Sequence, residues 1–486
     1  MNPSLASLLT TIFICYLFKR DFRKQPNISN ALWIPWLWMI ILGSRYVTEW
    51  LNLGSSGQSW GVANDYQDGS PIDRMVFFLL LAAALYVLWK RHISWAQVLR
   101  NNVWIALFLL YCVVSTLWSD FPFVAFKRWI KILGHPLMSL LIFSEHEPVL
   151  AIKTVIKRCA YVLIPISVLY IKYYPHLGRG FDQWTGEAVN FGVTTNKNAL
   201  GILCVVFGLF FFCDLLSLFG KKSQHRNIME KSIVIIFLYM ILWLLQMNKS
   251  ATALIALIIS IFVVVALGFP FIKKNLEICI CIGIAIFFIL QITFNITEIA
   301  ILSLGKNLTL TDRTEVWAAV LKMNIDPLIG TGFESFWLGK RLETLWAEYW
   351  WQPNQAHNGY LEVYINLGYI GLFFLGGAIF SSFRNMRKTL IPHFNRDKSE
   401  IDGFDFGRFR MALLVAILVY NITEATFKAL HTLFWMFFVI AIEYKRVQSE
   451  VIGSNTRFDH GINRLNETKR SRRLERTMMF SRARRD

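Results

Sequence analysis

His357 lies in the segment "NQAHNGYLEVYINLGYIGL", residues 354–372, where a polar, aromatic-rich stretch meets an apolar one. Histidine changes charge near neutral pH and often serves as a general base. Without any parallel, the segment favours a plainer interpretation, a surface histidine just before a helix that Asn358 caps. A catalytic role for His357 therefore depends on which other side chains lie beside it.

Arg313 lies in "LTDRTEVWAAVLKMNIDPLIGTGFESF", where Asp312 and Glu315 have the spacing of a capping box at the start of a helix. Arg313 would then occupy the first helical position, where free backbone N–H groups favour anions. Its planar guanidinium suits phosphate oxygens. A salt bridge with a nearby acid is an equally good interpretation of the residues alone.

Two lysines and an arginine follow one another closely in "WSDFPFVAFKRWIKILGHPL". Lys127 and Lys131 share one helical face, with Arg128 beside them. The group is expected at the outer end of an apolar span. It either snorkels to lipid headgroups or forms an anion-binding wall.

Lys249 in "QMNKSATALIAL" and the group Asn196, Lys197 and Asn198 in "NFGVTTNKNALGIL" also precede apolar runs. Taken by itself, Lys249 is best interpreted as an anchor at the membrane interface. For the asparagines, capping of a helix N-terminus is a sufficient explanation.

The elements that would position these residues are membrane-spanning helices. Of the 486 residues 55% are hydrophobic and 17% charged, and the mean hydropathy is +0.44. Such a chain is expected to be an all-α polytopic membrane protein. We expect about 12–13 spans, near residues 5–18, 31–51, 72–89, 102–118, 123–143, 155–172, 198–219, 232–247, 251–271, 276–303, 358–382, 408–423 and 429–444.

Basic residues alternate between the predicted loops and set an orientation. Placing every basic loop in the cytoplasm puts the N-terminus outside and the C-terminus inside. The expected organisation is a ten-span bundle (1–303), a large extracytoplasmic loop with surface helices (304–357), three further spans (358–444) and a basic, disordered cytoplasmic tail (445–486). This loop-by-loop distribution of a net charge of +18 argues against nucleic acid as a partner.

Three stretches, "STLWSDFPFVAFKRWI", "TDRTEVWAAVLKMNIDPLIGTGFESF" and "AHNGYLEVYINLGYIGL", resemble the O-antigen ligase and polymerase superfamily in order and spacing. "GVTTNKNALG" is most similar to its exopolysaccharide-polymerase branch, and the resemblance covers roughly residues 115–440. It implies a glycosyltransferase of the bacterial inner membrane with an outer-face site and an undecaprenyl-diphosphate-linked glycan donor. The implied acceptor is a glycan or a lipid core.

The resemblance also implies roles for particular residues. His357 matches the histidine that acts on the acceptor hydroxyl, and Arg313 matches an arginine that holds the diphosphate. Lys249 stands where a further arginine is expected, and it supplies the charge without the bidentate fork.

The chemistry that glycosyl transfer needs agrees with these roles. Arg313, Lys249 and the pair Lys127 and Arg128 would stabilise the departing diphosphate, and His357 would deprotonate the acceptor. Glu424, in "NITEATFKAL", is a candidate to orient the histidine or bind sugar. Four polar residues are further candidates for substrate binding: Asn196, Lys197, Asn198 and Asn358.

No Asp-x-Asp motif lies in a predicted outer segment, so neither a metal nor another cofactor is expected. Membrane lipids and chain-length or export proteins are expected partners. The residues do not decide between a polymerase and a ligase. The rival class is a flippase or other transporter without catalysis, although its charges would lie near the bilayer midplane. A non-catalytic scaffold is a third class.

Overall fold

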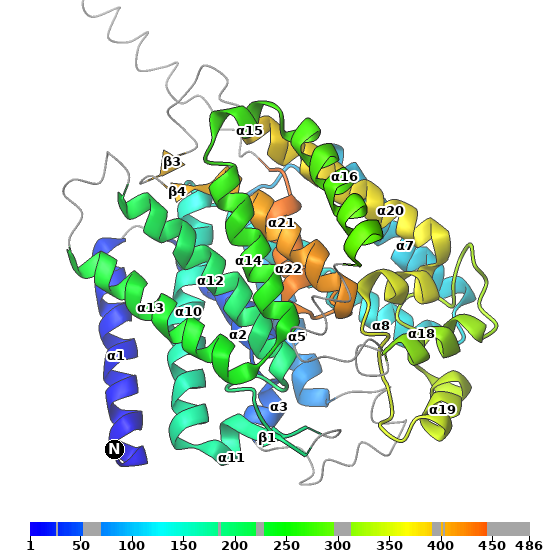
Figure 1. Ribbon diagram of the computed structural model, residues 1–486, viewed down its shortest axis with the longest axis horizontal. Helices are drawn as coiled ribbons and strands as arrows, with labels where there is room; N and C mark the ends of the chain where they lie inside the picture. The colour runs from blue at the N-terminus through cyan, green and yellow to red at the C-terminus, as the bar shows by residue number, and fades with distance from the viewer. Residues whose placement is uncertain are drawn as a thin grey trace, which may run out of the picture. The chain divides into compact units, whose positions relative to one another are not determined.

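The computed structural model describes residues 1–25, 28–51, 70–182, 186–219, 228–295, 313–390, 400–401 and 404–444. The expected tail (445–486), the first part of the expected large loop (304–312) and the capping residue Asp312 lie outside these ranges. The described chain is mainly helical, with only two short antiparallel strand pairs among the described residues (Figure 1), as expected for an all-α protein.

The described elements follow one another along the chain in this order. The helices are α1 (Pro3–Lys24), α2 (Trp33–Leu42), α3 (Val47–Trp50), α5 (Pro71–Lys90), α6 (Trp95–Asn101), α7 (Val103–Val114), α8 (Pro122–Ile132), α9 (Gly134–Phe143), α10 (Pro148–Tyr173), α11 (Pro175–Gly178), α12 (Lys197–Phe219), α13 (Ile228–Asn248), α14 (Ala251–Ala266), α15 (Pro270–Lys274), α16 (Leu276–Phe294), α18 (Arg313–Lys322), α19 (Gly339–Glu348), α20 (Gly359–Leu390), α21 (Phe406–Thr423) and α22 (Thr432–Ala441). Two short antiparallel pairs accompany them, β1 (Arg179–Phe181) with β2 (Ala188–Asn190), and β3 (Glu400–Ile401) with β4 (Phe404–Asp405).

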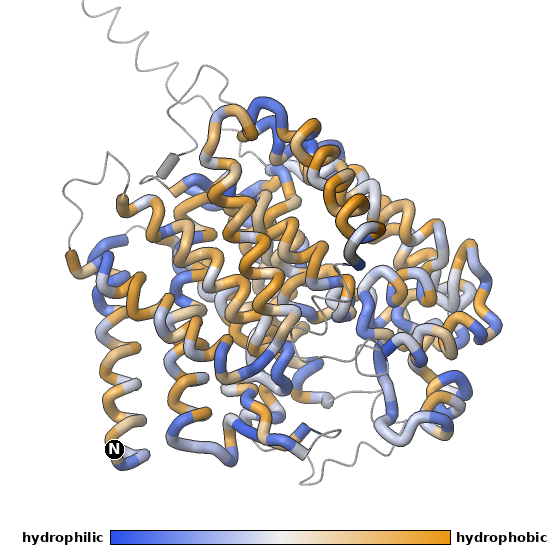
Figure 2. The backbone as a smooth tube through the Cα atoms, viewed as in Figure 1, coloured by the Kyte–Doolittle hydropathy of each residue, from blue (hydrophilic) through white to orange (hydrophobic). Residues whose placement is uncertain are grey.

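Six of the described helices are long and apolar enough to cross a membrane, namely α5, α12, α13, α16, α20 and α21. The bent pair formed by α6 with residues 103–118 would make seven. Figure 2 shows apolar residues along α14 and α16, with hydrophilic residues gathered at helix ends. The protein is therefore an all-α, multi-pass membrane protein.

The number of such helices differs from the expected 12–13, and local features explain the difference. The stretch expected as one span, 123–143, is divided into α8 and α9. At that junction a side chain on Gly134 would come within 2.1 Å of the Trp38 ring. The expected spans 31–51 and 429–444 form the ten-residue helices α2 and α22. Helices α1 and α10 are long enough, but charged residues lower their hydropathy.

Helix α12 lies at the centre of the bundle and packs against α10, α13, α14 and α21. Small residues allow the close approach to α14, since a side chain on Gly201 would come within 2.7 Å of the Ala253 Cβ. The N-terminus of α12 and the C-terminus of α21 consequently meet, and the Tyr420 hydroxyl donates to the Asn198 carbonyl at 2.8 Å. This junction positions half of the candidate site.

The chain before α20 supplies the other half. Helices α18 and α19 share a small apolar core with the start of α20, built from residues that include Val320, Trp337 and Leu345. Gly368 bends α20 at a positive φ of 63°, where a side chain would meet the Leu328 carbonyl oxygen at 2.2 Å. The loop that follows α18 is thereby held against α20.

Candidate functional site

His357 occupies the turn immediately before α20. Its backbone has a φ of 49°, a left-handed value that is uncommon for residues other than glycine. On one side, the Ala356 N–H donates to Glu362 at 2.9 Å. On the other, Asn358 accepts from the N–H groups of Tyr360 and Leu361 at 3.0 and 3.1 Å, so it acts as the N-cap of α20. The backbone on both sides of His357 is thus fixed at the helix start.

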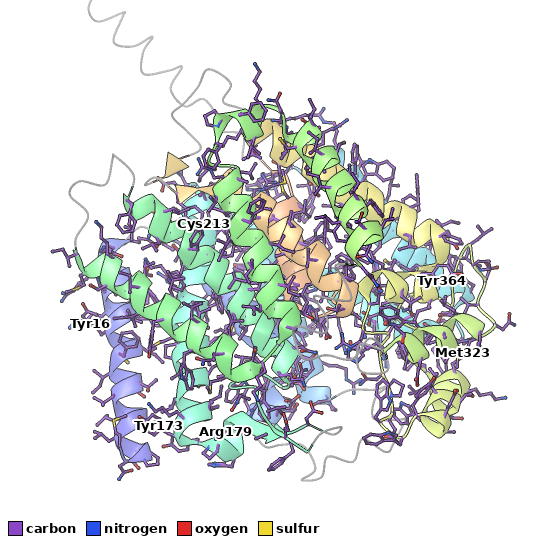
Figure 3. All side chains as sticks on the ribbon, in the orientation of Figure 1. Tyr16, Tyr173, Arg179, Cys213, Met323 and Tyr364 are labelled. Atoms are coloured by element: carbon purple, nitrogen blue, oxygen red, sulfur yellow. The ribbon has the colours of Figure 1, made fainter. Side chains whose placement is uncertain are left out.

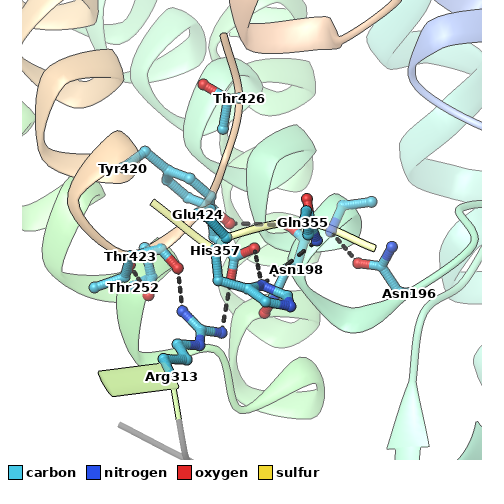
Figure 4. A network of polar contacts seen from close by, with 12 residues as sticks. Asn196, Asn198, Thr252, Arg313, Gln355, His357, Tyr420, Thr423, Glu424 and Thr426 are labelled. Atoms are coloured by element: carbon cyan, nitrogen blue, oxygen red, sulfur yellow. Dashed lines mark hydrogen bonds and ion pairs between the residues drawn. The ribbon is translucent and has the colours of Figure 1, made fainter. Parts of the chain in front are cut away.

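Glu424 ends α21 and is the point at which the candidate residues meet (Figure 4). Its Oε2 lies 3.3 Å from Nδ1 of His357. Its Oε1 accepts from Arg313 Nη2 at 2.8 Å and from Asn198 Nδ2 at 2.6 Å. Glu424 is only 7% exposed. A carboxylate that is buried but has several donors is stabilised in its charged form.

The pKa of Glu424 reflects this balance. Burial by itself raises the pKa of the carboxyl, but His357 and Arg313 favour the carboxylate and outweigh burial, so the pKa lies below its ordinary value. An ionised carboxylate only accepts hydrogen bonds, so the His357 nitrogen facing it, Nδ1, carries the proton. Nε2 is then the basic nitrogen of the ring.

Within the described residues α18 begins at Arg313, where the sequence predicted the first helical position. Besides its contact with Glu424, its Nη1 donates to the Thr423 carbonyl oxygen. One guanidinium therefore binds a carbonyl at the C-terminal end of α21 together with the carboxylate that follows it. The salt bridge that the residues alone left open is present, and its acid lies 111 positions away in the chain.

The three polar residues at the start of α12 have different partners. Asn198 joins Glu424, whereas Asn196 accepts from the Ala199 N–H at 2.9 Å in the manner of a cap. Lys197 pairs with Asp182 at 2.5 Å. Only one of these three candidates contacts the Glu424 network directly.

Lys249 lies in the tight turn between α13 and α14, with a φ of 51°. It is exposed, and none of the described residues forms a hydrogen bond or ion pair with it. The turn borders the network, because Thr252 hydrogen-bonds Thr423 through their hydroxyls at 2.8 Å. Lys249 therefore lies three residues from a side chain that contacts the end of α21.

Lys127 and Arg128 lie elsewhere. Lys127 stacks over the Phe123 ring at 4.9 Å. Arg128 Nη1 donates to the Glu334 carbonyl, and its Nε is 4.0 Å from the Glu334 carboxylate. Glu334 in turn accepts from the Ala429 N–H at 2.5 Å. Arg128 is thus linked through Glu334 to the far part of the turn that begins at Glu424, and no described contact joins it to His357.

Sequence reasoning missed a group of charges beside the histidine. Lys428 Nζ lies 3.4 Å from Gln355 Oε1 and 3.7 Å from Glu362 Oε1. Gln355 Nε2 lies 3.4 Å from His357 Nδ1. Closeness in sequence could have identified them, because Gln355 is two residues from His357 and Lys428 is four residues from Glu424.

A cavity of about 10 Å³ lies between Lys428, Glu362, Glu334 and Asn366, which is room for about one water molecule. Within the described ranges, no cluster of three His, Cys, Asp or Glu side chains has the arrangement of a metal site.

Fold and site together define a multi-pass helical membrane protein whose polar centre is built from the ends of α12, α18, α20 and α21. A family model described as O-antigen ligase matches residues 232–376, a region that contains Lys249, Arg313 and His357. The chain is also 24% identical over 341 residues to the exopolysaccharide production protein ExoQ of Rhizobium meliloti (strain 1021), covering 67% of this chain and 75% of that protein. Both findings are similarities to proteins of the O-antigen ligase and polymerase superfamily, and they support its exopolysaccharide branch.

Proposed function

We propose that this protein transfers a glycan from undecaprenyl diphosphate to an acceptor hydroxyl during assembly of a bacterial surface polysaccharide. One observation carries the proposal. His357 and Arg313 bind the two oxygens of a single buried carboxylate, Glu424, at 3.3 and 2.8 Å. A base and a phosphate-binding cation are the two groups that this transfer needs, and Glu424 holds both.

In the proposed reaction His357 is the general base. Glu424 holds Nδ1–H, and Nε2 takes the proton of the acceptor hydroxyl as its oxygen attacks the anomeric carbon of the donor. The carbon–oxygen bond to the diphosphate breaks, and undecaprenyl diphosphate leaves with the bonding electrons. The Glu424 carboxylate stabilises the imidazolium that forms, as the acidic member of a catalytic triad does.

Arg313 is proposed to bind the diphosphate. A guanidinium has five N–H donors, and its contacts with Thr423 and Glu424 leave others for phosphate oxygens. The side chain of Arg313 is 18% exposed, which leaves it partly accessible. Lys249, exposed at the neighbouring turn, would add a second positive charge. Lys127 and Arg128 enter the proposal only as a more distant cationic surface.

Orientation belongs to the same proposal. The N-terminus would lie outside and the C-terminus in the cytoplasm, with the site on the extracytoplasmic face of the inner membrane, where lipid-linked glycans are polymerised or ligated. The segment 304–357 would be an extracytoplasmic loop between the helices that precede it and those that begin at residue 358.

Reconstitution tests the proposal. The purified chain is placed in liposomes with a lipid-diphosphate-linked repeat unit and no ion gradient, and glycan length is followed on gels. Longer glycans are expected from the enzyme, whereas a flippase would move the donor across the bilayer without lengthening it. Glycan chains in a deletion strain then separate the two reactions. Single units still attached to the final acceptor indicate a polymerase, and long unattached chains indicate a ligase.

A further inference from the structure

A second cluster of charged side chains joins α1, α10, α12 and α13, at ends of these helices remote in sequence from His357. Two of its contacts are balanced pairs. Arg158 binds Asp21 at 2.7 Å, and both side chains are buried. Lys153 Nζ lies 3.3 Å from Asp214. Buried charges need such partners, because an uncompensated ion away from water is costly.

The third acid of the cluster, Glu230, is not balanced in this way. Arg20 binds its Oε1 at 2.5 Å, and Lys157 lies 3.9 Å from its Oε2. Lys24 also contacts Oε1. Even with Lys24 set aside, two cations on two helices share one carboxylate. The other acids near Lys157, Asp214 and Asp21, already pair with Lys153 and Arg158. The cluster therefore has a surplus of positive charge.

The side chains of Arg20 and Lys157 are 14% and 20% exposed, so a ligand can reach them without the cluster coming apart.

Apolar side chains border the cluster. Tyr16, labelled on α1 in Figure 3, hydrogen-bonds the Met229 sulfur at 2.8 Å and so links α1 to α13. Tyr16, Met229 and Ile228 are 44%, 46% and 81% exposed. A ligand bound here would meet cations at one end and an exposed apolar surface beside them. A membrane lipid, which has a charged headgroup and apolar tails, matches this arrangement.

We propose that Arg20 and Lys157, with Lys24 at the rim, bind the phosphate group of an anionic lipid headgroup between α1 and α10, beside the start of α13. Basic residues near a membrane surface attract anionic lipids, and a pocket of such residues between helices is a recognised site for lipid phosphates. The bound phosphate supplies the negative charge that Glu230 alone does not, and it ties α1 to the bundle. This inference is independent of the proposed glycan transfer.

Lipid titration of the purified full-length chain in detergent tests the inference. Thermal unfolding and native mass spectrometry are recorded with phosphatidylglycerol, with phosphatidylcholine and with inorganic phosphate. Phosphatidylglycerol is expected to bind more tightly than phosphatidylcholine and to raise the unfolding temperature. Lys157→Gln should weaken phosphatidylglycerol binding about fivefold, the effect of one surface cation.

Two variants separate binding from a structural role. Glu230→Gln removes the competing carboxylate and should retain or tighten phosphatidylglycerol binding, even if the lipid-free protein is less stable. Lys90→Gln changes an exposed lysine that stacks on Tyr86, away from the cluster, and should bind as the wild type does. Equal binding of both lipids, or wild-type binding by Lys157→Gln, would overturn the proposal. Stabilisation by inorganic phosphate alone, equal to that by phosphatidylglycerol, would overturn the assignment to lipid.

Discussion

Nδ1 of His357 lies 3.3 Å from Oε2 of Glu424, although 67 positions separate the two residues in the chain. The contact joins the start of α20 to the end of α21 and fixes which ring nitrogen is protonated. The same carboxylate also binds Arg313 through its other oxygen, so Glu424 connects the candidate base to the candidate phosphate-binding cation.

Glu424→Gln should reduce glycan transfer by roughly 100-fold, because an amide neither fixes the imidazole tautomer nor stabilises the imidazolium. Donor binding should change little by comparison. Initial rates across a range of donor concentrations measure the two effects. Glu443→Gln is the matched control, because it removes a carboxylate that pairs with Arg410 instead. Equal rates for the Glu424 variant and the wild type would remove Glu424 from the mechanism.

Replacement of Arg313 should affect stability as well as activity. Arg313→Gln removes the guanidinium that pairs with the buried Glu424 carboxylate. Because this carboxylate then lacks its cation, the free energy of unfolding should fall by about 1–3 kcal/mol. In a double-mutant cycle with Glu424→Gln the two losses should not add, because both variants break one interaction. Thermal unfolding of the four proteins provides the measurement. If the two losses of stability added as independent effects do, the contact between Arg313 and Glu424 would contribute nothing to stability.

Asn196 and Asn198 provide a contrast two residues apart. Asn196→Ala removes a helix cap, so about 1 kcal/mol of stability should be lost while the rate per folded molecule stays close to normal. Asn198→Ala removes a donor from Glu424 and should lower the rate as well. Rates normalised to folded protein distinguish the two results. The same loss of rate in both variants would contradict the separation made here.

The pKa of Glu424 predicts how stability depends on pH. The folded-state pKa lies below the ordinary value of 4.5, so the carboxylate contributes stability that is fully present above pH 4.5. That contribution should be lost as the pH falls below 4.5 and through the folded-state pKa. Unfolding temperatures between pH 7 and pH 3.5 should therefore fall less steeply for Glu424→Gln than for the wild type. Parallel curves of unfolding temperature against pH would show that protonation of Glu424 does not contribute to the pH dependence of stability.

Hydropathy and charge predicted the fold class and several helices closely. Helix α12 begins at Lys197 where a span was expected from residue 198, and α21 ends at Thr423 as expected. The breaks were not predictable by the same means, because they depend on tertiary contacts. The division of 123–143 occurs where Gly134 packs on Trp38, a residue 96 positions earlier in the chain.

For the site, residue types identified His357, Arg313, Asn198 and Glu424 one at a time. Their convergence on Glu424 could not be predicted, because it joins segments that are 67 to 226 positions apart. Residue type also suggested similar roles for cations whose surroundings differ. Arg128 and Lys249 have the same charge, but one binds Glu334 and the other is exposed at a turn. Roles in catalysis remain predictions for all of these residues.

The most direct test of the account is the rate of glycan transfer by purified His357→Ala, measured with a lipid-diphosphate-linked donor alongside wild-type protein of equal folded content. The account predicts a loss of 100-fold or more, the contribution typical of a general base, with donor binding retained because Arg313 is unchanged. Glycan made by His357→Ala at the wild-type rate would contradict it.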